Sequence, residues 1–159
     1  MNRWWFGLSV AVSGWCMTYG LSVGTPDLQI ATRLNFAQLL FAFVITPFYI
    51  GFAFSLFPSG WKHRWIFIAS VLLTVLAEIF LFTNHAFITV PKPPFYFHFH
   101  VKSGYFPHLI NIALLPSIIV LLTILESRKA SGHRRNQLAY FAIASIAGFI
   151  TGDMVIPLS

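Results

Sequence analysis

Five long apolar stretches, separated by short polar segments, run along this chain of 159 residues. They cover approximately residues 4–24, 36–57, 65–83, 107–125 and 137–157. A helix needs roughly 20 apolar residues to cross the roughly 30 Å hydrocarbon core of a bilayer, and each stretch is close to that length. The pattern predicts a single multi-pass membrane domain.

Only α-helices and closed β-barrels cross a bilayer, because every backbone N–H and C=O group in lipid must be paired within the protein. Barrel strands alternate apolar and lumen-facing polar residues over about ten positions. The stretches here are continuously apolar, as residues 39–45 illustrate. We therefore expect an all-α membrane protein, a bundle of five transmembrane helices.

The longest segment between two apolar stretches is residues 85–106. Two β-prone runs in it flank a proline-rich turn at residues 91–94, a pattern typical of a β-hairpin. Side chains alternate along a strand, so Phe97 and Phe99 would share one face while His98 and His100 share the other. We expect this hairpin to cover one end of the bundle.

The composition agrees with a membrane protein. The chain is 57% hydrophobic and 18% aromatic, and only 9% of its residues are charged, whereas a soluble domain has about 25% charged residues. The net charge of +6 is explained by basic loops on one side of a membrane rather than by a nucleic-acid partner. The single cysteine, Cys16, cannot form an intrachain disulfide.

The lysine and arginine residues predict the orientation. Loops on one side hold seven of them: Arg3, Lys62, Arg64, Arg128, Lys129, Arg134 and Arg135. Loops on the other side hold three: Arg33, Lys92 and Lys102. The positive-inside rule then places the amino terminus in the cytoplasm and the carboxyl terminus outside the cell membrane.

Small residues spaced four apart indicate faces on which helices pack closely. Gly20 and Gly24 form such a pair in the first stretch, and Ala144, Gly148 and Gly152 form a longer series in the last one. Packing within the chain is the favoured interpretation. Association with another subunit is the alternative.

Two acidic residues are candidates for a ligand site. Glu78 lies well inside the third stretch, where a carboxylate is costly and marks a functional hypothesis by default. Pairing with a neighbouring hydroxyl is the competing interpretation. Asp153 lies near the outer end of the fifth stretch, and His85 begins the outer loop.

Histidine is the commonest metal ligand, and the outer segment is rich in it. His98 and His100 form a His-x-His pair, while His85 and His108 bracket the same loop. These residues are candidate ligands for copper, zinc or haem iron. No cysteine or acidic residue accompanies them in the loop, so no particular metal or cofactor is indicated.

The sequence gives little support for catalysis. It contains no phosphate-binding loop, no HExxH motif and no serine or cysteine nucleophile with a matching base. Pro47 and Pro116 suggest interrupted helices, but there is no internal repeat of the kind found in transporters. We expect a protein that is not an enzyme.

Four local patterns carry a resemblance to a known family. They are Trp15 with residues 27–36, residues 46–48 with Gly51, Phe52 and Phe54, residues 104–106, and residues 134–138 with Gly148 and residues 156–158. Together they resemble the membrane input region of bacterial sensor histidine kinases, which has seven amino-terminal helices. The five stretches would correspond to its second through sixth helices.

This resemblance implies a sensor-like bundle in the bacterial inner membrane. The first and last helices of that region and any output module would be absent, and the resemblance names no ligand. A sensor-like bundle would bind a small or lipidic ligand between helices, near Glu78, His85 and His98.

The alternative is an accessory subunit of a respiratory or photosynthetic complex, which the small size and the 18 Phe, 5 Trp and 5 Tyr residues favour. The expected partners are the lipid bilayer and other membrane subunits or further copies of this chain. No nucleic acid is expected among them.

Overall fold

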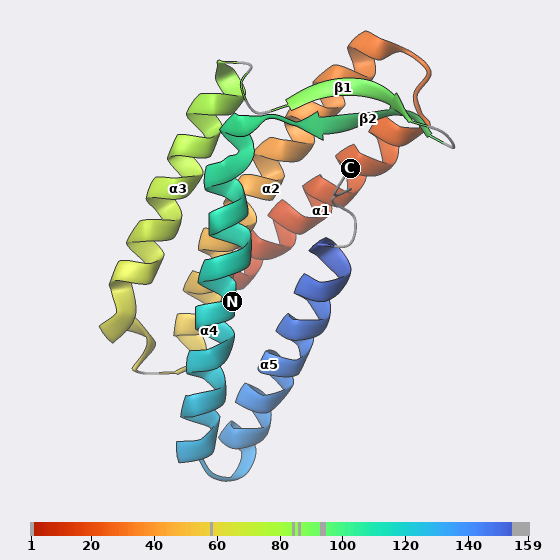
Figure 1. Cartoon of the computed structure of the whole chain (residues 1–159). Helices are drawn as coiled ribbons and strands as arrows, with labels where there is room; N and C mark the ends of the chain where they lie inside the picture. The colour runs from red at the N-terminus through yellow and green to blue at the C-terminus, as the bar shows by residue number, and fades with distance from the viewer. Residues whose placement is uncertain (1, 58, 84, 86, 93–94, 154–159) are drawn as a thin grey trace.

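The computed structural model describes residues 2–57, 59–83, 85, 87–92 and 95–153. These residues form five α-helices and one two-stranded antiparallel sheet (Figure 1). The helices are α1 (Arg3–Gly24), α2 (Leu28–Leu56), α3 (Arg64–Phe82), α4 (Phe106–Lys129) and α5 (Gly132–Asp153). The strands are β1 (Phe87–Lys92) and β2 (Phe95–Val101). The expected mostly helical fold with a small hairpin is confirmed.

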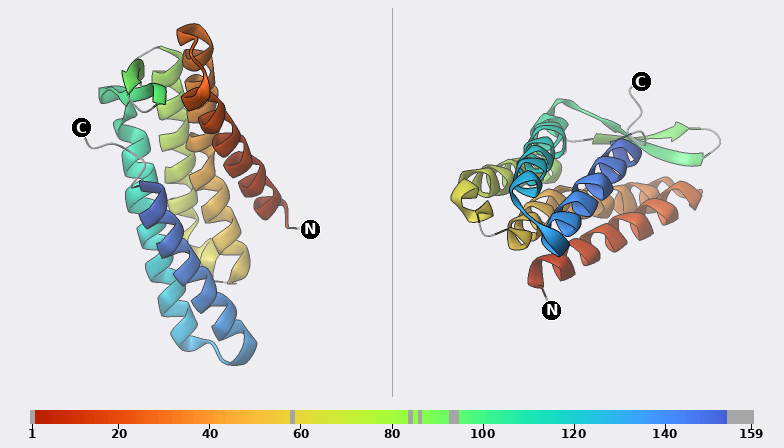
Figure 2. Two further views of the ribbon diagram at one scale, coloured as in Figure 1. Left: turned by 90° about the vertical axis from the view of Figure 1, so that its right-hand side faces the viewer. Right: turned by 90° about the horizontal axis from the view of Figure 1, so that it is seen from below.

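Successive helices run antiparallel, so the connections gather at two ends of the bundle (Figures 1 and 2). The α1–α2 turn and the β-hairpin lie at one end, and the hairpin contacts α1 and α2. The start of α1, the short helical turn η1 (Gly60–His63) and the α4–α5 turn lie at the other end. A second short turn, η2 (Ser103–Tyr105), leads from the hairpin into α4.

Helix α2 begins eight residues earlier than residue 36, where the apolar pattern placed its start. Asp27 caps it, because its side chain accepts hydrogen bonds from the backbone N–H groups of Gln29 and Ile30 at 2.8 and 2.9 Å. The added turns contain exposed polar residues such as Arg33. Hydrophobicity does not mark such turns, whereas an Asp at the N-cap does.

Four helices within the described residues, α1 to α4, are long and apolar enough to cross a membrane. The fifth expected span, residues 137–157, departs from this pattern. Helix α5 forms, but it begins with the exposed polar residues 132–137 and is not among the helices that are apolar enough. Residues 154–157 of the expected span lie outside the described residues.

The outer surface of the bundle is apolar. Met17 on α1 exposes 68% of its surface, and Leu72 and Phe82 on α3 each expose 65%. Such extensive apolar exposure is unusual for a soluble monomer and suits contact with lipid chains. The interior holds two packed groups of apolar residues, one beneath the hairpin around Phe43 and one at the opposite end around Phe54.

Close packing between α1 and α2 depends on glycines other than those expected. A Cβ atom on Gly14 would lie 2.6 Å from the Phe41 ring, and one on Gly51 would lie 2.5 Å from the Trp4 indole. A Cβ atom on Gly20 or Gly24 would instead meet open space.

The expected face on α5 is open at two positions. Ala144 is exposed, and a Cβ atom on Gly148 would meet open space. The side-chain surroundings of Gly152 lie outside the description. An added Cβ atom would thus have room at Gly20, Gly24 and Gly148, and a role of these two series in helix packing stays a prediction.

Candidate ligand site

Six buried polar residues lie inside the bundle, and we call them the buried polar cluster. They come from α2, α3 and α4, and none exposes more than 6% of its surface: Gln38, Thr46, Ser70, Thr74, His108 and Asn111. The spacing explains their common direction, because residues three or four apart lie on one face of a helix. Ser70 and Thr74 therefore share the inner face of α3, and His108 and Asn111 share that of α4.

A chain of hydrogen bonds joins α2, α3 and α4 through this cluster. The Ser70 hydroxyl donates to Asn111 Oδ1 at 2.8 Å, and Asn111 Nδ2 donates to Thr74 Oγ1 at 2.9 Å. The Thr74 hydroxyl donates in turn to the backbone carbonyl of Phe43 at 3.0 Å. In an apolar interior such bonds between helices are stabilising and directional.

Pro47 explains why the carbonyl of Phe43 is available. In an α-helix the N–H of residue i bonds to the carbonyl of residue i−4, and proline has no N–H. Phe43 is four residues before Pro47, inside α2. A buried carbonyl without a donor is costly, and Thr74 of the neighbouring helix supplies the donor.

His108 is the most enclosed titratable side chain of the cluster, with 1% of its surface exposed. Its ring centroid lies 4.5 Å from that of Phe43 and 5.0 Å from that of Tyr105. Its Nδ1 atom has no hydrogen-bond partner among the described residues.

Two further buried atoms of the cluster also lack a hydrogen-bond partner among the described residues. Gln38 Oε1 and Thr46 Oγ1, both on α2, are buried and have no hydrogen-bond partner within the described ranges. Buried polar atoms in proteins are almost always paired, by protein, water or ligand. The imidazole of His108, the amide oxygen of Gln38 and the hydroxyl of Thr46 can each form a hydrogen bond with a further polar group.

The hairpin is joined to the bundle beside this cluster. Asn35 of α2, one turn before Gln38, donates from Nδ2 to Thr89 Oγ1 of β1 at 3.3 Å. Phe87 of β1 is buried among apolar residues of α2 and α3. The backbone N–H of Gly104 donates to the carbonyl of His85 at 3.1 Å, which holds the start of α4 close to the end of α3.

No hydrogen bond or ion pair joins the residues expected to bind a ligand in the described part of the chain. Glu78 is half-buried on α3, one turn after Thr74, and the described residues provide no hydrogen bond or ion pair for its carboxylate. His85 is exposed at the hairpin end. Asp153 is the last residue described in α5, and its side chain lies outside the description.

Two of the expected metal ligands, His100 and His108, lie in different surroundings, and the side-chain surroundings of His98 lie outside the description. In the sheet, His98 pairs with Val90 and His100 pairs with Ile88, so the two histidines occupy alternate positions of β2. His100 is exposed, whereas His108 is buried inside the bundle. In the part of the chain that is described, no group of three or more His, Cys, Asp or Glu residues could hold a metal ion.

Most of the buried polar cluster was not among the residues singled out from the sequence. Of its six members, only His108 was proposed, and in a different role. The available signals were hydroxyl residues four apart, Ser70 and Thr74, in an otherwise apolar helix, together with Pro47, whose missing N–H requires a donor from elsewhere.

The chain matches no protein-family model, no curated protein sequence and no solved structure. The class of protein is therefore defined by its own architecture, a helical bundle with four helices suited to a membrane and a polar cluster within an apolar interior.

Proposed function

We propose that this is a non-catalytic, membrane-embedded input module that binds a small hydrogen-bonding ligand in the buried polar cluster. Its location would be the bacterial inner membrane. The apolar outer surface supports membrane insertion. The likeness of its proline-containing and arginine-rich segments to the input regions of sensor histidine kinases supports a sensory role.

One observation carries the ligand proposal. Three buried polar atoms, His108 Nδ1, Gln38 Oε1 and Thr46 Oγ1, have no partner among the described residues. Leaving such an atom unpaired costs about 1–3 kcal/mol. A ligand that forms hydrogen bonds with these atoms recovers that free energy, which provides affinity in an otherwise apolar interior.

The same geometry supports a response to the ligand. The His108 ring lies against the ring of Phe43, and the carbonyl of Phe43 is held by Thr74 rather than by its own helix. A ligand beside His108 therefore acts next to the place where α2 has no internal hydrogen bond. Helices interrupted by proline bend at such places.

The ligand proposal is tested by extracting the protein from native membranes in mild detergent. Native mass spectrometry should find a small molecule bound to the wild type and absent from H108F/Q38L. H100A, which changes an exposed histidine of the hairpin, is the control and should keep the molecule. Equal occupancy in all three proteins, or no bound molecule in the wild type, would overturn the ligand proposal.

An accessory subunit of a larger membrane complex is the second candidate. The observation that favours it is the open space beside Gly20 and Gly24, which are four apart on α1. A helix of another subunit packs closely against such a pair. The extract described above separates the candidates, since a multi-protein or coloured particle would support a subunit of a respiratory or photosynthetic complex.

We propose the orientation in the membrane that the distribution of lysine and arginine residues predicts. The end with the α4–α5 turn holds seven of the ten lysine and arginine residues, which supports a cytoplasmic amino terminus and a cytoplasmic α4–α5 turn. An extracytoplasmic carboxyl terminus requires in addition that α5 complete a crossing.

A further inference from the structure

The turn between α4 and α5 concentrates exposed positive charge. Arg128 and Lys129 end α4, and Arg134 and Arg135 lie in the first turns of α5. Only residues 130–131 separate the two helices, so the four cations gather at one tip. All four residues are exposed, and we call this surface the basic tip.

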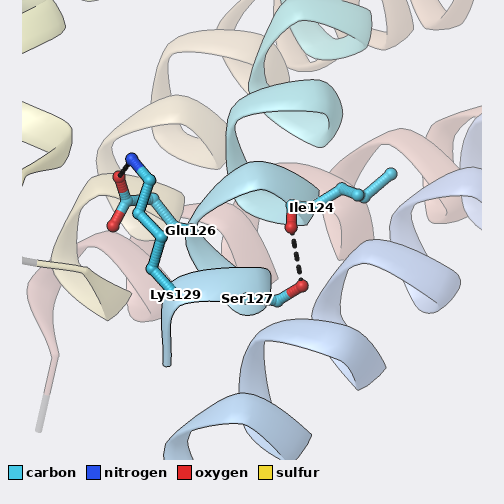
Figure 3. A network of polar contacts seen from close by, with 4 residues as sticks. All are labelled: Ile124, Glu126, Ser127 and Lys129. Atoms are coloured by element: carbon cyan, nitrogen blue, oxygen red, sulfur yellow. Dashed lines mark hydrogen bonds and ion pairs between the residues drawn. The ribbon is translucent and has the colours of Figure 1, made fainter. Parts of the chain in front are cut away.

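Little negative charge neutralises the basic tip. Glu126 is the only acidic residue in the sequence between Glu78 and Asp153, and its carboxylate accepts from Lys129 Nζ at 3.3 Å (Figure 3). No ion pair involves the guanidinium groups of Arg128, Arg134 or Arg135 in the described ranges. Guanidinium groups bind phosphate through two parallel hydrogen bonds.

Helix lengths set the depth of the basic tip. Helix α3 has 19 residues and α4 has 24. At 1.5 Å per residue, α4 is longer by about 7 Å. The outer ends of both helices are held together by the Gly104–His85 hydrogen bond, so the extra length extends beyond the other end of α3, as Figure 1 shows.

That extension matches the headgroup layer of a membrane. Helix α3 spans about 28 Å, close to the hydrocarbon thickness of about 30 Å, and each headgroup layer adds about 5–8 Å. Trp61 in η1 and Trp65 at the start of α3 are both exposed, and tryptophan is enriched at the boundary of the hydrocarbon layer. The basic tip then lies at the depth of the lipid phosphates.

We propose that the basic tip binds the phosphate groups of anionic phospholipids in the cytoplasmic leaflet. This inference rests on the proposed membrane insertion. The positive-inside rule requires only that the loops be positively charged. It does not require the protein to prefer one lipid headgroup over another. A binding surface adds a preference for anionic lipid that depends on these particular arginines.

The test uses the whole protein purified in a neutral detergent. Binding of short-chain phosphatidylglycerol is followed by native mass spectrometry, with short-chain phosphatidylcholine and free glycerol phosphate as the comparison probes. R134Q/R135Q removes two charges from the basic tip. R33Q/K102Q removes two charges from the hairpin end and is the matched control.

We expect the wild type to bind phosphatidylglycerol at least tenfold more tightly than phosphatidylcholine. R134Q/R135Q should lose at least about tenfold in affinity for phosphatidylglycerol, since each cation near an anionic surface contributes about a factor of five. R33Q/K102Q should bind as the wild type does, and R134K/R135K should keep most of the affinity because the charges remain.

Three outcomes would overturn the inference. They are equal binding of the two lipids, equal loss in the two double variants, and competition by free glycerol phosphate that abolishes lipid binding. A separate fractionation keeps the two proposals apart. A protein that alkaline carbonate releases from membranes would refute membrane insertion, whereas a protein that stays in the membrane without lipid preference would refute only the basic tip.

Discussion

The hydroxyl of Thr74 on α3 donates a hydrogen bond of 3.0 Å to the backbone carbonyl of Phe43 on α2. That carbonyl is the one to which Pro47 has no N–H to donate. Residues 31 positions apart thereby complete each other's hydrogen bonding. The bond ties the proline-interrupted part of α2 to α3 and, through Asn111, to α4.

Thr74→Val should destabilise the bundle by about 2–3 kcal/mol, because it leaves the Phe43 carbonyl and the Asn111 amide without their buried partner. Thr74→Ser keeps the hydroxyl and should cost less. The measurement is unfolding in mixed micelles, followed by circular dichroism.

Pro47→Ala provides the matching half of a double-mutant cycle. Alanine at position 47 supplies an N–H to the carbonyl of Phe43, so T74V should cost about 1 kcal/mol less in the P47A background than in the wild type. The part of the T74V destabilisation that comes from the unpaired Asn111 amide should be the same in both backgrounds. A T74V cost that is the same in both backgrounds would show that the proline does not create the need for Thr74.

His108 and Asn111 are one turn apart on α4 but should respond oppositely to apolar replacement. His108→Phe removes a buried Nδ1 that has no described partner and keeps a ring beside Phe43, so stability should change by less than about 1 kcal/mol. Asn111→Leu removes two buried hydrogen bonds and should cost about 2–4 kcal/mol.

The comparison is made on protein depleted of bound small molecules by detergent exchange, with both variants unfolded under the same conditions. An H108F variant as unstable as N111L would mean that the imidazole is paired in the folded protein. It would also weaken the proposed ligand site.

Gly51→Ala should destabilise the contact of α1 with α2. Its new Cβ atom would lie 2.5 Å from the Trp4 indole, which is itself enclosed by Phe48, Trp61 and Phe67. Overpacking of this kind costs about 1–3 kcal/mol. Unfolding in mixed micelles also tests Gly20→Ala. Its new Cβ atom would meet open space, so the change should be neutral or slightly stabilising. Equal effects of both changes would contradict the observed helix contact.

Cysteine labelling tests the orientation. In a Cys16→Ala background, S131C in the α4–α5 turn should react with a membrane-impermeant maleimide only in inverted vesicles. S103C at the hairpin end should react only in spheroplasts. The reason is the excess of lysine and arginine at the α4–α5 end. The reverse labelling pattern would place that end outside.

Hydrophobicity along the chain was enough to predict the helical class and the hairpin, since long apolar runs and alternating aromatic residues each have one common structural outcome. It misplaced the start of α2, because the first turns of that helix are polar and are set by the cap at Asp27. It also missed the polar first turns of α5, because the apolar run begins only at about residue 137 whereas the helix begins at Gly132.

The interior polar contacts were harder to foresee. Whether Ser70 faces Asn111 or lipid depends on how α3 and α4 rotate about their axes, and an apolar helix without a polar face carries little information about rotation. The sequence likewise does not show which glycines contact another helix. Gly20 and Gly51 are alike in sequence terms, and only the arrangement of α1 against α2 shows which one must stay small.

The composition of α5 has a consequence for how the protein is made. Its first turns are polar, and Leu138, Ala142 and Ser145 are covered by other parts of the bundle. Phe141 stacks on Tyr49 of α2, with ring centroids 5.5 Å apart. A segment of this kind gains little by leaving the translocon for lipid alone. Because α5 follows the other four helices along the chain, the residues that cover it have already been synthesised when it emerges.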